Sequence, residues 1–215
     1  MVRAVIFDLD GTLLDTLEDI GRAANRVLSS NGFPEHPLES YKHFVGDGAA
    51  VLFQRALPDG FGRGDTLERC LRQFREDYGR AWNVATKLYP GVPDLLNGLA
   101  GRGVRMSVFS NKPHAITVAC VDGFLGDWAF DVVLGHRDGA PKKPDPSGAL
   151  AIAVRTGVRP DEFLYLGDTG TDMETAHRAG MRPIGALWGF RTREELKAAG
   201  AEHLLQHPAE LIDLL

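Results

Sequence analysis

Four short polar clusters hold the side chains with the greatest capacity for chemistry in this 215-residue chain, and each follows an apolar run or opens a helical pattern. They are DLDGTLLD at 8–15, SNK at 110–112, KKPDP at 142–146 and GDTGTD at 167–172. In an open parallel sheet the carboxyl ends of the strands border one crevice. We therefore expect the four clusters to converge on a single site.

Carboxylates dominate two of these clusters. Asp8 and Asp10 lie two residues apart just after an apolar run, so on an extended chain both can face the same site. Asp168 and Asp172 supply a second pair. Such crowding of like charges is costly unless protons or a cation relieve it. A hard cation with oxygen ligands is the natural relief, and Mg²⁺ suits a few carboxylates with a phosphate oxygen, whereas no Cys/His spacing typical of zinc is present.

The other two clusters offer a site for an anion. Ser110 has a hydroxyl and is followed by backbone N–H groups, which at the mouth of a helix form an anion site. Lys143 precedes a helix opened by Pro146 and can direct a fixed positive charge into the crevice. A metal, an anion cradle and a lysine together form a set that handles phosphate.

Each cluster taken alone also has an ordinary structural explanation. Aspartates beside Gly11 are common in turns, where the side chain hydrogen-bonds the backbone. Ser110 can be a plain N-cap, and one aspartate of the fourth cluster can cap a helix while the other stays unexplained. Loop lysines are usually solvated, and we expect this of one of the adjacent pair Lys142 and Lys143. The combination of all four clusters is what indicates phosphate chemistry.

Short apolar runs that alternate with helical patterns must position these clusters. The expected strands are rich in Val, Ile, Leu or Phe, as parallel strands buried on both faces should be: 4–7, 104–109, 130–134, 163–166 and 183–188. Helices opened by Pro93 and Pro146 and closed by glycines lie between them, and Thr192 with Glu195 has the spacing of a capping box. The alternation predicts an α/β fold with a doubly wound, mostly parallel sheet.

One region interrupts this alternation, since from about residue 17 to 87 we find helical patterns and no strand. An apolar stripe from Leu17 to Leu28 ends at Gly32, and Asp65 with Glu68 can cap a second helix. A turn signal at 89–91 marks the exit. The sequence therefore predicts a core domain at 1–15 and 88–215 and a small helical domain at 16–87.

Composition excludes several other classes of protein. Hydrophobic residues make up 44% and charged residues 25%, as in a globular protein with a sizeable core. Acids outnumber Lys and Arg by 29 to 24 and no basic run occurs, so we expect no nucleic-acid partner. No apolar run approaches the roughly 18 residues of a membrane span, and the run after Met1 is too short for a signal peptide. With only two cysteines, Cys70 and Cys120, we expect a cytoplasmic protein without a disulfide framework.

The four clusters resemble the motifs of the haloacid dehalogenase superfamily over nearly the whole chain. Residues 8–13 resemble its first motif, Ser110 its second, Lys143 its third, and Asp168 with Asp172 its fourth. An aspartate at the position of Asp10 is typical of the family's phosphatases and phosphomutases, because a leaving alkoxide needs a proton donor. The helical insertion resembles the family's small helical cap.

A narrower similarity is to the phosphoglycolate phosphatases. It is carried by SNKP at 110–113, FVGDGA at 44–49, WGF at 188–190 and REEL at 193–196. Two segments depart from that group, namely GHR at 135–137 and TGT at 169–171. The resemblance therefore implies a small-molecule phosphate ester as substrate, most like 2-phosphoglycolate, and Mg²⁺ as cofactor.

The resemblance also implies roles for single residues. Asp8 would attack phosphorus and form an aspartyl-phosphate, while Asp10 would protonate the leaving oxygen and then take a proton from water. The implied metal ligands are Asp8, the Asp10 backbone carbonyl and Asp168, with Asp172 acting through water or as support. Phosphate-binding residues implied by the motifs are Gly11, Thr12, Ser110, Asn111 and Lys143.

The helical domain is expected to select the substrate. We expect Gly46, Asp47 and Gly48 to lie near the crevice when this domain closes; alternatively, they only start a helix at 51–57 with Asp47 near its N-cap. Rival functions are a β-phosphoglucomutase-like phosphomutase, a pyrophosphate or nucleotide phosphatase, and a catalytically silent binding protein of the same fold. We expect a monomer or a homodimer.

Overall fold

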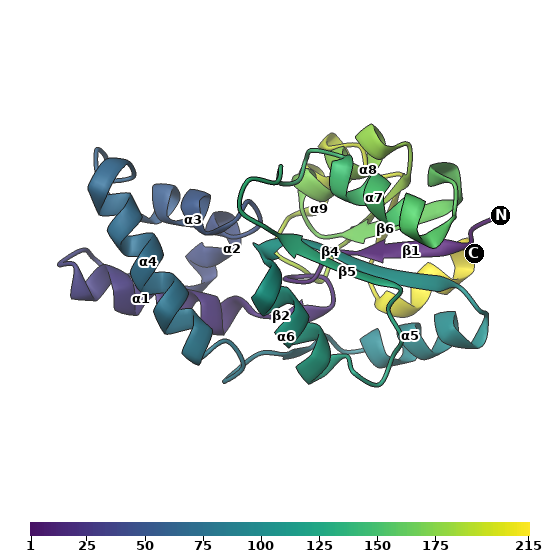
Figure 1. Ribbon diagram of the computed structural model, residues 1–215, viewed down its shortest axis with the longest axis horizontal. Helices are drawn as coiled ribbons and strands as arrows, with labels where there is room; N and C mark the ends of the chain where they lie inside the picture. Colours follow the sequence, from purple (N-terminus) through teal and green to yellow (C-terminus); the bar gives the residue numbers. More distant parts are fainter. The chain divides into compact units, whose positions relative to one another are not determined.

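The computed structural model describes all residues, 1–215, and the chain divides into two compact units (Figure 1). The first unit comprises 1–14 and 88–215, and the second comprises 15–87. The chain passes between them at β2 (Leu14–Asp15) and β3 (Lys87–Leu88), which pair as a two-stranded sheet. That the helical unit acts as a cap stays a prediction.

A six-stranded sheet forms the centre of the first unit. Its strands are β1 (Ala4–Phe7), β4 (Arg105–Pro113), β5 (Val132–His136), β6 (Phe163–Gly167), β7 (Arg182–Ala186) and β8 (His203–Leu205). The order is β5-β4-β1-β6-β7-β8, and every neighbouring pair is parallel. The doubly wound α/β prediction is therefore confirmed, with β8 as a strand that the sequence analysis did not find.

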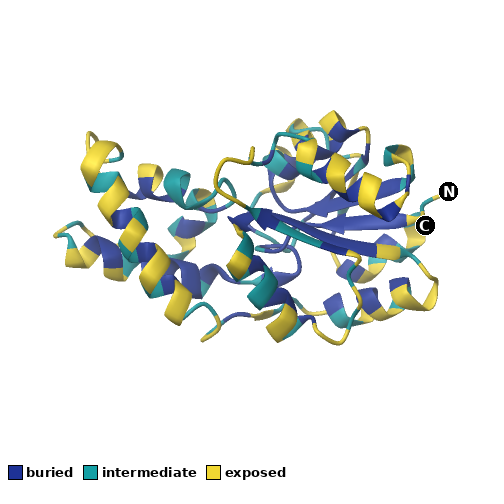
Figure 2. Cartoon of the chain, viewed as in Figure 1, coloured by how far each residue is buried: buried dark blue, intermediate teal, exposed yellow.

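The register of the central strands aligns the ends of β1 and β6, where the candidate residues lie. Phe7 at the end of β1 pairs with Val108 on β4 and with Leu166 on β6. All four residues of β1 are buried, as expected for an apolar strand with neighbours on both edges (Figure 2). The residues that follow β1 and β6 therefore leave the sheet side by side.

Five α-helices surround this sheet, with α7 and α8 on one face and α5 and α6 on the other (Figure 1). They are α5 (Val92–Gly101), α6 (His114–Phe124), α7 (Ser147–Thr156), α8 (Gly170–Ala179) and α9 (Arg193–Ala198). Short 3₁₀ turns lie at Pro160–Glu162 and Pro208–Leu214. Beneath α7 and α8 a buried cluster includes Ile6, Phe109, Ile152, Phe163 and Tyr165.

Several expected helix ends are present. Gly157 closes α7 with a left-handed backbone, and the Thr192 side chain accepts a hydrogen bond from the Glu195 N–H at the start of α9. Ser110, however, lies inside β4, which continues to Pro113, and α6 begins only at His114. The expectation of a helix mouth or N-cap at Ser110 was therefore wrong.

The second unit is helical. It contains α1 (Leu17–Ser30), α2 (Tyr41–Phe44), α3 (Ala49–Ala56) and α4 (Gly64–Arg80), with a 3₁₀ turn at Leu38–Ser40. Helix α4 packs on α1 and α3, where Phe53 and Phe74 meet edge to face. The sequence predicted that Asp65 caps this helix, but Asp65 lies inside α4, which begins at Gly64.

A buried carboxylate ties the two ends of this unit together. Asp19, near the start of α1, accepts hydrogen bonds from the backbone N–H groups of Ala85 and Thr86 and from the Thr86 hydroxyl, at 2.7–3.0 Å. It thus fixes the exit segment against the entry helix. No helix of the chain is both long and apolar enough to cross a membrane.

Candidate active site

The first candidate residue, Asp8, directly follows the central strand β1. Its N–H continues the sheet by donating to the Leu166 carbonyl at 2.9 Å, and its Oδ1 accepts from the Leu9 N–H at 2.7 Å. Only 5% of the residue is exposed. The sheet therefore holds this carboxyl group in a fixed orientation at the strand end.

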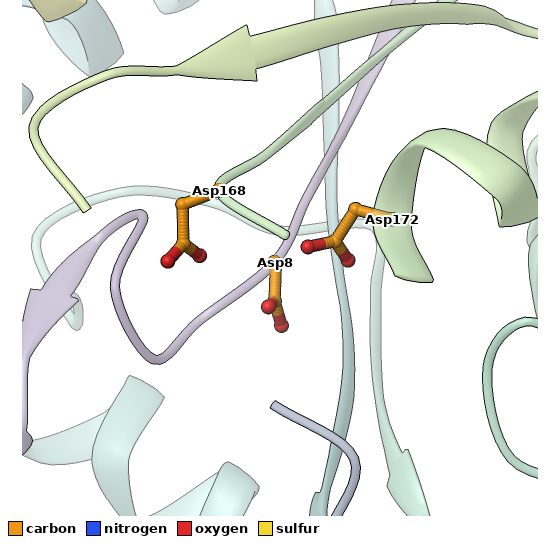
Figure 3. Close-up of side chains that lie close together, drawn as sticks. All are labelled: Asp8, Asp168 and Asp172. Carbon is orange, nitrogen blue, oxygen red and sulfur yellow. The ribbon is translucent and has the colours of Figure 1, made fainter. Parts of the chain in front are cut away.

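Asp8, Asp168 and Asp172 form a group of buried carboxylates (Figure 3). One oxygen from each lies within 4.8 Å of the others. Asp168, directly after β6, accepts from the Thr12 hydroxyl at 3.0 Å and from the Phe190 N–H at 2.8 Å. The structure thus brings together three of the four aspartates that the sequence singled out.

Asp172 takes part in the N-terminal cap of α8. Thr169 is the N-cap residue, and its N–H and hydroxyl donate to Asp172 Oδ2 at 3.1 and 2.7 Å. The other oxygen, Oδ1, accepts from Lys143 Nζ at 2.6 Å. Asp172 therefore combines the capping role weighed in the sequence analysis with a place in the carboxylate group.

Lys143 is the cation of this site. Its Nζ lies 2.9 Å from Asp8 Oδ1 and 2.6 Å from Asp172 Oδ1, and it also donates to the Phe109 carbonyl at 3.2 Å. The Asn111 side chain fixes the lysine backbone, accepting from the Lys143 N–H at 2.8 Å and donating to its carbonyl at 3.2 Å. Of the adjacent lysines, Lys143 is buried, whereas Lys142 is partly exposed.

The site carries more negative than positive charge. Burial, followed by the neighbouring Asp172, raises the pKa of Asp8 to about 7 although Lys143 opposes the shift. Burial and the two other carboxylates likewise raise the pKa of Asp168 well above its usual range. For Lys143, burial lowers the pKa, but Asp172 and Asp8 outweigh it and the net shift is upward. One ammonium thus leaves the three carboxylates incompletely neutralised, and an all-oxygen donor set of this kind fits a hard divalent cation.

Asp10 takes a different position from the other three aspartates. Its carboxyl lies outside the group of three and accepts from Lys112 Nζ at 2.7 Å, with both side chains largely buried. Lys112 is a residue to which the sequence analysis gave no role. Its place as the third residue of the SNK cluster is the only feature of the sequence that could have indicated a role for Lys112 in the site.

The loop after β1 approaches Asp168 so closely that it needs glycine. Gly11 has φ +86°, and a Cβ at this position would lie 2.3 Å from Asp168 Oδ2. The N–H groups of Gly11 and Thr12 donate to the carbonyls of Leu14 and Leu9 at 2.9 and 3.3 Å. The Thr12 hydroxyl donates to Asp168. The expected phosphate-binding role of Gly11 and Thr12 stays a prediction.

Ser110 and Asn111 border a cavity of about 230 Å³. Leu134, His136, Arg137 and Ser147 also line it. The Ser110 hydroxyl accepts from the Lys112 N–H at 3.2 Å. Ser110 and Asn111 are both buried, and their binding of phosphate stays a prediction.

The remaining candidates, Gly46, Asp47 and Gly48, lie in the second unit. Both glycines have positive φ, +117° and +89°, and Asp47 accepts from Arg55 Nη2 at 2.7 Å. The N-cap of α3 is Gly48 and Asp47 directly precedes it, so the alternative that placed Asp47 near an N-cap agrees with the structure, although the helix begins at Ala49 and not at 51. Arg55 also donates to the carbonyls of His43 and Phe44, which fixes this loop within its own unit.

Comparison with known proteins places this geometry in a family. The model of the haloacid dehalogenase-like hydrolases matches residues 5–186. The chain belongs to that family. It is an enzyme of the phosphoric monoester hydrolase class, as the resemblance of the four motifs predicted.

Relatives in several bacteria carry a common name. A phosphoglycolate phosphatase of Pseudomonas putida is 36% identical over 87% of this chain and 70% of its own length. A phosphoglycolate phosphatase of Aquifex aeolicus is 31% identical over 100% of this chain and 97% of its own.

Solved structures agree with the fold. A predicted phosphoglycolate phosphatase from Haemophilus somnus superposes with a TM-score of 0.89 at 26% identity, covering 99% of this chain and 97% of that one. CbbY from Rhodobacter sphaeroides, solved in complex with phosphate, superposes with a TM-score of 0.80 at 27% identity, covering 98% of this chain and 96% of that one.

Proposed function

We propose that this protein is a Mg²⁺-dependent phosphatase that hydrolyses a small phosphomonoester through an aspartyl-phosphate on Asp8, with 2-phosphoglycolate as its substrate. The observation that carries this proposal is the group of buried carboxylates formed by Asp8, Asp168 and Asp172, of which Asp8 and Asp172 contact the buried Lys143. A purely structural cluster has no need for three buried carboxylates with one cation, because the excess charge is destabilising.

The first step uses Asp8 as a nucleophile. A carboxylate oxygen of Asp8 bonds to phosphorus while the bond from phosphorus to the ester oxygen breaks. Asp10 gives a proton to the departing oxygen, which leaves as an alcohol. In the second step Asp10 takes a proton from a water molecule as the water oxygen bonds to phosphorus, and the bond from phosphorus to the Asp8 oxygen breaks. Inorganic phosphate is released and the Asp8 carboxylate is restored.

Fixed charges support both steps. Lys143 is held by two carboxylates and a carbonyl, so its ammonium is oriented before substrate binds. Asp8, the Asp10 carbonyl and Asp168 would hold Mg²⁺, with Asp172 supporting them. When bound, Mg²⁺ would neutralise charge on the carboxylates and on the phosphoryl oxygens. Ser110 and Asn111 would bind the transferred phosphoryl group.

The choice of 2-phosphoglycolate rests on the names of the relatives from Pseudomonas putida and Aquifex aeolicus. A second candidate is a sugar bisphosphate, because a CbbY variant from Rhodobacter sphaeroides, 27% identical to this chain, was solved in complex with xylulose-1,5-bisphosphate. In both cases we propose that the loop containing Gly46, Asp47 and Gly48 contributes to substrate choice.

A substrate panel with and without Mg²⁺ tests the proposal. The panel contains 2-phosphoglycolate, xylulose-1,5-bisphosphate, glucose 1-phosphate, pyrophosphate and a nucleoside monophosphate, and both free phosphate and isomerised sugar phosphate are measured. We expect Mg²⁺-dependent release of phosphate, fastest from 2-phosphoglycolate. Isomerisation without release would instead indicate a phosphomutase, and no turnover of any compound would indicate a binding protein.

The variant Asp8→Asn tests the nucleophile. It should abolish turnover and leave the circular dichroism spectrum unchanged, because the amide occupies the same volume. Asp94→Asn, an exposed position on α5, is the matched control and should keep wild-type turnover. Retained turnover in Asp8→Asn would rule out the aspartyl-phosphate.

A further inference from the structure

One other lysine besides Lys143 is buried in this chain, and it lies at the same site. Lys112, on β4, has a side chain that is 3% exposed, and its Nζ lies 2.7 Å from Asp10 Oδ1. The remaining lysines are partly or fully exposed. The proposed reaction uses Asp10 and Lys143 but gives Lys112 no task, so its buried charge calls for an explanation.

Stability alone does not explain a buried ammonium at this position. Removing an ammonium and a carboxylate from water is costly, and replacing such a pair by packed apolar side chains is often neutral or stabilising. The low exposure does not separate Lys112 from a substrate, because the side chain of the proposed nucleophile Asp8 is itself only 7% exposed. Lys112 is therefore a candidate for contact with the substrate.

The backbone holds Lys112 at this point of β4. Its N–H donates to Ser110 Oγ at 3.2 Å, and its carbonyl accepts from the Thr117 hydroxyl at 3.1 Å. On the neighbouring strand β5, a Cβ at Gly135 would lie 2.8 Å from the same carbonyl, so only glycine lets β5 pack this closely. The peptide and the ion pair together fix the ammonium beside Asp10 before a substrate binds.

The two buried lysines contact different carboxylates. Lys143 contacts Asp8 and Asp172, whereas Lys112 contacts Asp10. In the proposed reaction Asp8 bonds to phosphorus and Asp10 protonates the departing ester oxygen. Lys143 therefore lies on the side of the phosphoryl group, and Lys112 lies on the side of the leaving group.

A cation on this side fits a leaving group that is itself an anion. Asp10 has to lie within hydrogen-bond reach of the ester oxygen, and Lys112 Nζ lies one further hydrogen bond away. An ammonium has three N–H donors and can hold two anions at once, as Lys143 does with Asp8 and Asp172. The geometry thus suits a substrate whose anion lies close to the ester oxygen.

We propose that Lys112 is a specificity-determining residue, which binds an anionic group that the leaving group carries one carbon away from the ester oxygen. The carboxylate of 2-phosphoglycolate has this place. In xylulose-1,5-bisphosphate the sugar chain separates each ester oxygen from the other phosphate, so of the two candidates Lys112 favours 2-phosphoglycolate. The assignment rests on the proposed function, because it takes Asp10 as the acid for the leaving group.

A pair of matched substrates tests this role. 2-Phosphoglycolate and its amide, phosphoglycolamide, have the same shape, but only the former carries an anion beside the ester oxygen. The wild-type enzyme should prefer 2-phosphoglycolate by about tenfold or more in kcat/KM, which is what a hydrogen bond between charged groups contributes. Equal kcat/KM for the two esters would overturn the proposal, and this comparison needs no variant that has to fold.

Variants of Lys112 separate recognition of the substrate from support of Asp10. Lys112→Met should reduce the preference for 2-phosphoglycolate to within about threefold, and Lys112→Arg, which keeps the charge, should retain it. If Lys112 only holds Asp10 in place, its removal will slow both esters equally and leave the preference unchanged, which would contradict a role in specificity. Lys197→Met, at an exposed position on α9, is the matched control and should keep wild-type turnover of both esters.

Calorimetric binding to Asp8→Asn gives a readout without turnover. In this background Lys112→Met should weaken the affinity for 2-phosphoglycolate about tenfold and change the affinity for inorganic phosphate by less than about threefold. An unchanged affinity for 2-phosphoglycolate would refute the assignment and leave the proposed function standing. If the wild-type enzyme releases phosphate from no ester, the proposed function fails, and the same binding comparison still decides whether Lys112 binds the carboxylate.

Discussion

The contact between Gly11 and Asp168 allows a sharp test of how precisely the site is built. In Gly11→Ala the new Cβ would lie 2.3 Å from Asp168 Oδ2, whereas ordinary contact begins at 3.4 Å. Asp168 must therefore move by about 1 Å, and a displacement of that size near the reacting groups costs on the order of a hundredfold in rate. We expect kcat/KM for p-nitrophenyl phosphate to fall by about that factor, together with a weaker affinity for Mg²⁺.

The backbone strain of this substitution needs a separate control. Alanine at φ +86° costs about 1–2 kcal/mol wherever it occurs. Gly103 has φ +67° and no atom within 4 Å of a Cβ, so Gly103→Ala carries similar strain without the collision. It should lose about 1 kcal/mol of stability and no activity. If Gly11→Ala keeps kcat/KM within about threefold of Gly103→Ala, the close approach to Asp168 does not position this carboxylate.

Three further predictions concern the two units. Asp19→Ala leaves two backbone N–H groups without their acceptor and should lower the free energy of unfolding in urea by about 2–4 kcal/mol. Asp77→Ala, which removes an exposed ion pair, should lower it by less than about 1 kcal/mol. Equal losses in the two variants would contradict the role of Asp19 in holding residues 85 and 86 against α1. Because Asp8 has a pKa of about 7 when folded and 3.8 ordinarily, the ion-free protein should lose stability as the pH rises from 3.8 to 7, and Mg²⁺ should raise the melting temperature more at about pH 8 than at about pH 5. An equal rise in melting temperature at both pH values would contradict the raised pKa of Asp8. Asp47→Ala should change KM or the order of substrates more than kcat for p-nitrophenyl phosphate, and an unchanged order across the panel would refute its part in substrate choice.

The sequence was most informative where local pattern and buried environment agree. The strand at 4–7 is wholly apolar and wholly buried, so its limits and the place of Asp8 follow from the residues alone. Gly157 and Thr192 likewise mark helix ends by chemistry confined to a few residues. The parallel sheet could be predicted on this basis, whereas the family and the enzyme class were predicted from the resemblance of the four motifs to known enzymes.

Long-range contacts escaped the sequence analysis. The bond from Thr12 to Asp168 spans 156 residues and that from Lys112 to Asp10 spans 102, and no local pattern encodes either. Ser110 was placed at a helix mouth because a hydroxyl before a helical pattern usually caps it, whereas here β4 continues three residues further to Pro113. The tertiary pairing of β4 with β5, including its register shift after Phe109, overrides the local preference.

The position of the insertion has a consequence for how such enzymes diversify. Asp8 and the loop to Leu14 belong to the first unit, and the second unit begins at Asp15 and ends at Lys87. The segment 15–87 supplies none of the three clustered carboxylates and does not supply Lys143. Mutations that accumulate between these two points therefore fall outside the segments that hold the reactive groups in register. A lineage can remodel that stretch, lengthen it or acquire a different one by recombination, and inherit the phosphate chemistry unchanged.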